Sequence, residues 1–269
     1  MRHRIKLSSV LRRTPAPRLK QYAAAVLGAV VLAGLPLANA NAAGAVIDFE
    51  SAPLGPIGSY DPDAGPTLSD VFVSNGFYVG GFTNSPLGQA GDLIGSVVDG
   101  SDVYNTCWNM ACPTTASNPT QYLTALNDGA LWISHTTSTF KVQSFDAAFL
   151  GNYDTGTFPA TSGILRIQGT TLTGGALIQD FALDGPGTDG FEFGHYITSG
   201  AFANTEFTEI YLYGYACEAS GSCRAFGTNR GQFAIDNIAT TAPVPEPSTW
   251  LMLGAGLLAI GAATRRRQA

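Results

Sequence analysis

Basic side chains are scarce in the central part of this 269-residue chain. Residues 44–241 hold 19 acidic side chains but only four basic ones, Lys141, Arg166, Arg224 and Arg230, so their net charge is −15. A surface this acidic repels phosphate backbones, and the composition therefore excludes nucleic-acid binding by the central region. The other ten basic residues lie near the two ends of the chain, seven of them among the first 20 positions.

The motifs that carry common enzyme chemistry are also missing. The sequence has no G-x-S-x-G nucleophile turn, no H-E-x-x-H helix, no phosphate-binding P-loop and no dinucleotide fingerprint that leads from a strand into a helix. Glycoside hydrolysis needs only two suitably spaced carboxylates, and among 19 acids a pair such as Glu192 and Glu209 can always be nominated. His195 is typical of a hydrogen-bonded strand residue rather than of a general base. We therefore expect a protein that is not an enzyme.

No apolar run reaches the length of about 20 residues that is typical of a membrane-spanning helix. The first of two shorter runs, residues 22–37, follows a basic region and precedes a small-x-small cleavage pattern formed by Ala38 and Ala40. This arrangement predicts a secretory signal peptide over residues 1–42, cleaved after Ala40 or Ala42, with an uncleaved membrane anchor as the alternative.

The second run begins at Trp250 and ends before a cluster of three arginines. Its 14 apolar residues make a helix of roughly 21 Å, short of the hydrocarbon thickness of about 30 Å. The cluster, Arg265, Arg266 and Arg267, should stay cytoplasmic and leave the acidic region outside. These residues predict a short transmembrane helix that anchors the chain transiently in the inner membrane.

A specific motif precedes this second run. It consists of Val244, Pro245, Glu246 and Pro247. Pro-Glu-Pro, a short apolar helix and a terminal arginine cluster, in this order over residues 242–269, resemble the PEP-CTERM sorting signal of Gram-negative bacteria. The resemblance implies three processing partners: the export translocase, signal peptidase and the membrane protease exosortase. It also implies delivery to the cell surface or the exopolysaccharide matrix.

Residues 43–241 have the pattern of short β-strands. Apolar and polar side chains alternate in many short runs, which Gly, Pro, Asn and Asp separate. The runs are 45–50, 71–82, 131–137, 140–150, 164–168, 176–183, 191–197, 207–215 and 232–239. Spacing near ten residues predicts one all-β domain, a jelly-roll-like antiparallel sandwich of about 8–10 strands.

Three of these runs resemble strands of a PEP-CTERM subgroup. The run 232–238 matches a Gln-Phe-x-x-Asp strand that precedes the sorting tail, and the runs 46–50 and 140–146 are similar to other strands of the same proteins. The resemblance implies a sandwich laid out like carbohydrate-binding modules, in which the first and last strands are neighbours. It implies no enzymatic activity.

Four cysteines occur as two close pairs, Cys107 with Cys112 and Cys217 with Cys223. An even number in an exported chain favours disulfides, and of the three possible pairings the local one is the simplest. Loops this short contribute about 2 kcal/mol each, so the bridges act as loop staples. Zinc is excluded because neither pair has the C-x₂-C spacing.

Calcium is the cofactor that the composition favours, as a structural ion. It prefers several oxygen ligands, which an acidic exported sandwich offers. If the first and last strands are adjacent, Asp48 or Glu50 approaches Asp236, because all three alternate with apolar neighbours. Alternatively, Asp236 caps a turn or faces solvent.

Aromatic side chains offer faces on which sugar rings can stack, although they are also ordinary core material. The set comprises Trp108, Trp132, Tyr104, Tyr122, Tyr153, Tyr196, Tyr211, Tyr213 and Tyr215. Trp132, between Leu131 and Ile133, is expected to be half-buried, whereas Trp108 lies inside an expected disulfide loop and is the ligand-binding candidate. We therefore expect an exported surface or biofilm-matrix protein with a structural or binding role toward exopolysaccharide. The alternative is a secreted carbohydrate-active hydrolase.

Overall fold

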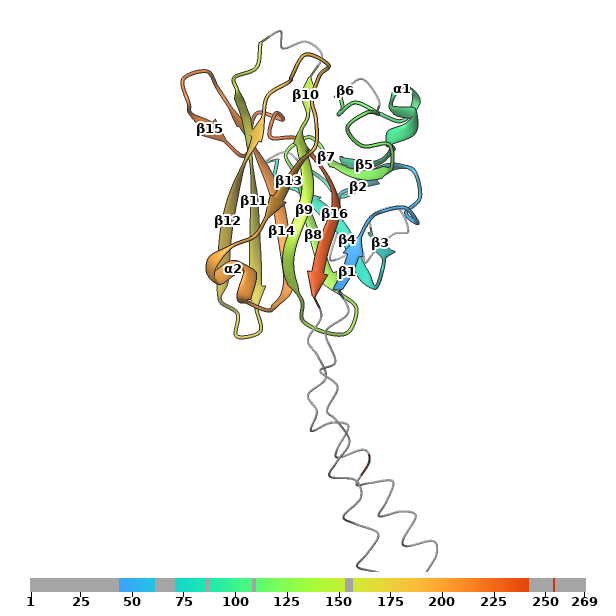
Figure 1. Cartoon of the computed structure of the whole chain (residues 1–269), viewed down its shortest axis with the longest axis vertical. Helices are drawn as coiled ribbons and strands as arrows, with labels where there is room; N and C mark the ends of the chain where they lie inside the picture. Colours follow the sequence, from blue (N-terminus) through green and yellow to red (C-terminus); the bar gives the residue numbers. More distant parts are fainter. Residues whose placement is uncertain are drawn as a thin grey trace, which may run out of the picture. The chain divides into compact units, whose positions relative to one another are not determined.

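The computed structural model describes residues 44–241 except 61–70, 86–87, 108–109 and 153–156, together with Gly254. Two seven-stranded antiparallel sheets form the domain (Figure 1). Sheet A has the strand order β13-β9-β16-β7-β5-β2, and β1 pairs with β16. Its strands are β1 (Gly44–Ile47), β2 (Gly55–Gly58), β5 (Leu93–Asp99), β7 (Gln121–Ala125), β9 (Lys141–Phe149), β13 (Gly194–Ile197) and β16 (Phe233–Thr241).

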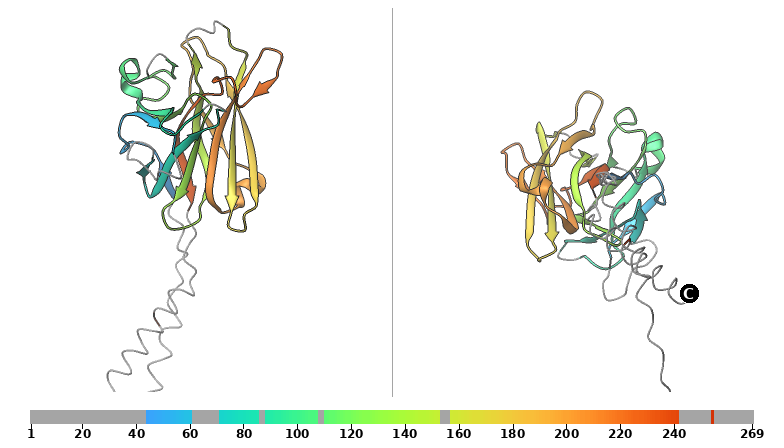
Figure 2. Two further views of the ribbon diagram at one scale, coloured as in Figure 1. Left: turned by 180° about the vertical axis from the view of Figure 1, so that it is seen from behind. Right: turned by 60° about the horizontal axis from the view of Figure 1, so that its bottom comes forward.

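Sheet B has the strand order β12-β11-β14-β8-β4-β3, and β15 pairs with β14. Its strands are β3 (Val71–Ser74), β4 (Phe77–Thr83), β8 (Gly129–His135), β11 (Thr161–Thr171), β12 (Ala176–Asp184), β14 (Phe207–Cys217) and β15 (Cys223–Arg224). A separate ribbon pairs β6 (Met110–Ala111) with β10 (Gly151–Asn152). Figure 2 shows the two layers from behind and with the lower end turned forward. The prediction of an all-β antiparallel sandwich is confirmed.

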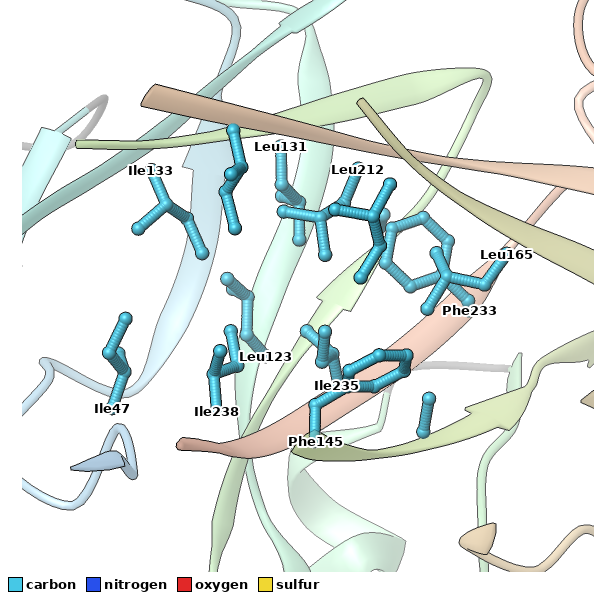
Figure 3. Packing of buried hydrophobic residues seen from close by; sticks show 14 of the residues in the cluster. Ile47, Leu123, Leu131, Ile133, Phe145, Leu165, Leu212, Phe233, Ile235 and Ile238 are labelled. Carbon is cyan, nitrogen blue, oxygen red and sulfur yellow. The ribbon is translucent and has the colours of Figure 1, made fainter. Parts of the chain in front are cut away.

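The main core fills the space between the two sheets (Figure 3). Sheet A contributes Ile47, Leu123, Phe145, Phe233, Ile235 and Ile238, and sheet B contributes Leu131, Ile133, Leu165 and Leu212. Each of these side chains is at most 1% exposed. Burying a side chain of this size contributes about 1.5–3 kcal/mol relative to leaving it in water, so this layer is the main source of stability.

The run 71–82 is not one strand, as the alternation predicted, but the hairpin of β3 and β4. Asn75 and Gly76 form its two-residue turn, and both have positive φ, 47° and 87°. Asn-Gly is the preferred pair for a type I′ turn, whose twist matches that of the flanking strands. The alternation continues across so short a turn, which is why the pattern alone suggested a single strand.

The domain has more strands than the predicted 8–10, because several lack alternation. Strand β5 is buried at nearly every position, with Val97 in the main core and Val98 in a second cluster on the outer face of sheet A. This second cluster consists of Val98, Cys107, Tyr122, Leu126, Ala148, Leu150 and Ala234. A strand covered on both faces reads as a continuous apolar run. A separate difference concerns the run 191–197, which forms a strand only over its last four residues.

The helices of the described residues are short. They are the 3₁₀ turn η2 (Gly100–Asp102), α1 (Val103–Thr106) and α2 (Gly200–Asn204). Asp99 begins the first of them by accepting a hydrogen bond from the Ser101 backbone N–H at 2.9 Å. In the part of the chain that is described, no helix has the length and apolar character needed to cross a bilayer.

The first and last strands are neighbours, as the resemblance implied. Strand β1 pairs with the second half of β16, from Ile47 opposite Ile238 to Gly44 opposite Thr241. The first half of β16 pairs with β7 on the same side, while β9 lies along its other side. Strand β16 therefore changes its neighbour on one side at Asp236 and Asn237, where its register with β9 also shifts.

Asp236 is fully buried at this change of neighbour. Its Oδ2 accepts hydrogen bonds from Asn118 Nδ2 at 2.8 Å and from Thr120 Oγ1 at 3.2 Å, and its Oδ1 accepts one from the Asn237 backbone N–H at 2.8 Å. Burial raises the pKa of Asp236 to about 6, although these three hydrogen bonds oppose the rise and the nearby charge of Asp146 adds to it. The carboxyl group thus joins β16 to the segment before β7.

We predict that this carboxyl group makes stability depend on pH. The native state keeps its proton up to about pH 6, whereas the unfolded chain releases it near 3.8, the ordinary value. The native state binds more protons between these values, so the contribution of Asp236 to the free energy of unfolding falls as pH rises through this window. Two pKa units correspond to about 3 kcal/mol.

Denaturant unfolding of the wild type and of Asp236→Asn between pH 4 and 7 measures this effect. As pH rises to about 6, the free energy of unfolding of the wild type should fall relative to that of the variant. Above this pH the difference between the two proteins should stay constant. Asp189→Asn removes an exposed carboxylate and serves as the control. Parallel curves for wild type and Asp236→Asn would contradict the prediction.

Candidate functional site

Strand β14 directs alternate side chains to the two sides of sheet B. Ile210 and Leu212 are fully buried in the core, while Glu209, Tyr211 and Tyr213 are partly exposed. This alternation follows from the two-residue period of a strand. A row of polar and aromatic side chains therefore lies on the outer face of sheet B.

A groove of about 510 Å³ lies on this outer face. Its lining consists of Tyr60, Val71, Tyr78, Gly81, Phe82, Trp132, Glu209 and Tyr211. Trp132 of β8 lies opposite Tyr211 of β14 on one side and opposite Gly80 of β4 on the other. Because glycine has no side chain, nothing from β4 stands directly opposite the indole. We call this surface the aromatic groove.

Glu209 fixes the indole of the aromatic groove. Trp132 Nε1 donates a hydrogen bond to Glu209 Oε2 at 2.8 Å. Burial, followed by the charge of Glu209 and a hydrogen bond with it, raises the pKa of Tyr211 above its ordinary value. The phenol therefore stays neutral at physiological pH. The ring of Phe82 contacts that of Tyr211 edge to face, with 5.9 Å between the ring centroids. This contact holds the Tyr211 side of the groove in place.

The same face continues beyond the aromatic groove toward β12. Tyr213 lies 6.0 Å from Tyr215 and 5.4 Å from Phe226, measured between ring centroids. The guanidinium of Arg166 lies 5.0 Å from the centre of the Tyr215 ring and makes two hydrogen bonds to Asp180, at 2.6 and 2.7 Å. Arg166 is thus already neutralised, and this part of the face offers mainly aromatic surface.

Flat rings beside a carboxylate suit a ligand that is apolar on its faces and polar at its edges. The rings provide contact area, and Glu209 together with the tyrosine hydroxyls provides hydrogen-bonding groups around it. A groove of this volume lies within the usual range for small-ligand sites, about 300–1,000 Å³. A saccharide has this combination of surfaces.

The sequence predicted the residue types of this site but not their place. Trp108, the ligand-binding candidate, lies outside the described residues, so its role stays a prediction. Trp132 is half-buried, as expected, and it lines the aromatic groove. The alternation of Tyr211, Tyr213 and Tyr215 in one strand was a signal that could have indicated an aromatic face.

The two carboxylates nominated from sequence do not share a strand or a sheet. Glu192 is exposed and precedes β13 of sheet A, whereas Glu209 lies on β14 of sheet B. The aromatic groove has Glu209 as the single carboxylate of its described lining.

The predicted calcium ligands are engaged in hydrogen bonds within the protein. Asp48 Oδ1 accepts from Asn75 Nδ2 at 3.2 Å, and Glu50 Oε1 accepts from the Gln121 backbone N–H at 3.0 Å. The described ranges contain no group of three or more His, Cys, Asp or Glu side chains suited to a metal ion. Calcium stays a prediction, and the three hydrogen bonds to buried Asp236 count against that residue as a ligand.

His195 is a hydrogen-bonded strand residue, as its sequence context indicated. Its Nδ1 lies 2.7 Å from Asp146 Oδ1, and the two residues face each other across β13 and β9. The second oxygen of Asp146 accepts a hydrogen bond from Asn237 Nδ2 at 3.0 Å. This network supports the change of neighbour at β16.

Both local disulfides are present. Cys107 is bonded to Cys112, and Cys217 to Cys223. The first bridge is more than a loop staple, because buried Cys107 belongs to the second hydrophobic cluster. The second bridge closes the connection between β14 and β15.

The other predicted site residues lie outside the part of the chain that the structure describes. They are the signal-cleavage residues Ala38, Ala40 and Ala42 and the tail residues Val244, Pro245, Glu246, Pro247, Trp250, Arg265, Arg266 and Arg267. Comparison with family models nevertheless identifies the tail, since residues 243–267 match the PEP-CTERM protein-sorting motif. This match indicates an exported, surface-sorted protein.

No curated protein matches the chain. Among solved structures, a family 29 carbohydrate-binding module is 12% identical, with a TM-score of 0.33, over 74% of this chain and 91% of that one. A family 61 module solved with β-1,4-galactotriose is 10% identical, with a TM-score of 0.32, over 73% and 95%. A DUF4465 family protein from Bacteroides ovatus is 9% identical, with a TM-score of 0.37, over 75% and 99%.

Proposed function

We propose that this protein is an exported, exosortase-sorted surface protein that binds polysaccharide in the aromatic groove of sheet B. The observation that carries the proposal is the groove itself, in which Trp132 and Tyr211 lie side by side next to Glu209. The sorting motif at residues 243–267 supports a location where polysaccharide is the surrounding material.

The groove suits a sugar chain better than a purely apolar ligand. The hydrogen bond from the indole to Glu209 holds the Trp132 ring in place before a ligand arrives, which lowers the entropic cost of binding. The tyrosines supply broad contact area with few rotatable bonds and a hydroxyl at the edge. Tyr78, which is 41% exposed, widens the surface on the β4 side.

Binding fits the groove better than hydrolysis does. A retaining or inverting glycosidase needs two carboxyl groups that flank the scissile bond. The described lining supplies only Glu209, and this carboxylate is already hydrogen-bonded to Trp132. The alternative of a secreted carbohydrate-active hydrolase therefore lacks a specific observation in its favour.

The cellular route belongs to the same proposal. Signal peptidase would cleave after Ala40 or Ala42 during export, and the helix from Trp250 would hold the chain in the inner membrane of a Gram-negative bacterium until exosortase cleaves near Pro245–Pro247. The subgroup assignment rests on Gln232, which directly precedes the last strand, and on Phe233 and Asp236 within it. The exopolysaccharide matrix is the proposed destination and binding partner.

Replacing the indole should abolish most of the polysaccharide binding. We expect Trp132→Ala to weaken binding about tenfold or more, because a central aromatic contact contributes about 2 kcal/mol or more at such sites. Trp132→Phe keeps a flat ring but loses the hydrogen bond to Glu209, so an intermediate loss is expected. A glycan array, followed by affinity electrophoresis in gels that contain the best polysaccharide, measures the effect.

The matched control is Tyr104→Ala, which removes an aromatic side chain that is 95% exposed on α1, outside the groove. Thermal melting of each variant verifies that the fold is retained. If Trp132→Ala binds polysaccharide as tightly as Tyr104→Ala does, the aromatic groove is not the binding site.

The processing route predicts the mass of the mature protein. Intact-mass measurement on protein recovered from the culture medium or cell surface should find neither the residues before the cleavage site at Ala40 or Ala42 nor Arg265–Arg267. In a host without exosortase, the C-terminal arginines should remain. A surface form that keeps them in the native host contradicts exosortase processing and leaves the proposal on the groove unaffected.

A further inference from the structure

A second pocket, of about 370 Å³, lies at one end of the sandwich. Its lining includes Phe149, Leu150, Phe158, Pro159, Arg224 and Arg230. Figure 1 shows β15, which ends at Arg224, at the same end of the domain as β10. The lining shares no residue with the aromatic groove. We call it the arginine pocket.

The arginine pocket gathers two of the four basic residues in a region of net charge −15. Arg166 pairs with Asp180, but neither Arg224 nor Arg230 forms an ion pair with any described residue. Glu218 is the single carboxylate of the described lining, so the pocket carries a local excess of positive charge. Both arginine side chains are exposed, so their guanidinium groups are open to a ligand.

The backbone on both sides of the arginine pocket is held in place. Arg224 pairs with Ala216 across β15 and β14, and the Cys217–Cys223 disulfide closes that hairpin. The loop before Arg230 is fixed by buried Asp128, whose oxygens accept hydrogen bonds from the backbone N–H groups of Gly227 at 2.6 Å and Asn229 at 2.9 Å. The two arginines thus extend from ordered segments.

Two glycines allow the loop to lie close to sheet B. A side chain at Gly214 of β14 would collide with the backbone of Gly231, and a side chain at Gly231 would collide with that of Gly214. Gln232 extends the attachment, since its Nε2 donates to Asn229 O at 2.7 Å and its carbonyl accepts from the Leu150 N–H at 3.1 Å. The arginine pocket is therefore a built feature of the fold.

We propose that the arginine pocket binds the carboxylate of a hexuronic acid residue in an acidic polysaccharide. Guanidinium groups bind carboxylates through paired, charge-assisted hydrogen bonds. Phe158 and Pro159 supply an apolar wall for the ring of the sugar, and the volume accommodates one monosaccharide unit. The binding of an anion follows from the pocket alone, whereas the choice of a sugar acid rests on the proposed function.

The test is isothermal titration of the purified full-length protein in detergent with tri-galacturonate, its neutral counterpart galactotriose, and inorganic phosphate. The wild type should bind tri-galacturonate at least about tenfold more tightly than phosphate, and more weakly as salt is raised. In Trp132→Ala, whose aromatic groove is disabled, the same margin should hold over galactotriose. Arg224→Gln and Arg230→Gln should each weaken tri-galacturonate binding about tenfold, as expected for the loss of one charge-assisted contact.

Lys141→Gln is the matched control, because it also removes one positive charge. Lys141 begins β9, whereas Phe149, which lines the arginine pocket, ends it. The eight intervening steps span about 26 Å, several times the Debye length at physiological salt, so less than about a twofold change is expected. Trp132→Ala should leave tri-galacturonate binding intact, which separates this site from the aromatic groove. The assignment is overturned if tri-galacturonate does not bind the wild type, or if phosphate, or galactotriose in the Trp132→Ala background, binds as tightly as tri-galacturonate.

Loss of neutral polysaccharide binding alone would count against the aromatic groove and not against the arginine pocket. Loss of tri-galacturonate binding in Lys141→Gln to the same degree as in the arginine variants would mean that only net charge matters, and would overturn the assignment to this pocket.

Discussion

The hydrogen bonds of strand β16 connect most of sheet A. This strand lies along β9 on one side and is shared between β7 and β1 on the other, so the last strand of the domain joins elements from its beginning and middle. Sheet A is not complete until β16 is in place. Contacts between residues so far apart in sequence must overcome a large loss of chain entropy, and folds of this kind form slowly as a rule. The first-synthesised parts of the domain therefore depend on its last strand.

The two sheets differ in how their outer faces are covered. On sheet A, the segment that includes α1 and the Cys107–Cys112 bridge packs over Tyr122 and Ala234, and the buried carboxyl of Asp236 fills the place where β16 changes neighbour. On sheet B, Trp132 and Tyr211 have no such cover and form the groove instead. The aromatic groove thus arises where one sheet keeps a face open to solvent.

Local pattern was enough to predict the class of fold but not its register. The alternation in β9, β12 and β14 is visible in the sequence, because one face of each strand is buried and the other is at least partly open. Strand β5 was missed because it is covered on both sides. The aromatic groove could not be predicted, since Tyr60, Trp132 and Tyr211 meet only through pairings between distant strands. Asp236 was predicted as a possible metal ligand because the sequence does not reveal that it is buried. Its hydrogen-bond partner Asn118 lies over 100 residues earlier in the chain.

The adjacency of Gly44 and Thr241 also has a mechanical consequence. In an antiparallel pair whose outer ends lie together, a force that separates those ends breaks the backbone hydrogen bonds one after another, and the pair resists weakly. A load applied at the outer face of sheet B and resisted at Thr241 is transmitted through the packed core instead, where many contacts share it. A pull on a ligand held on sheet B would therefore be resisted by the whole core. Tension between the two ends of the domain would instead separate β1 from β16 first.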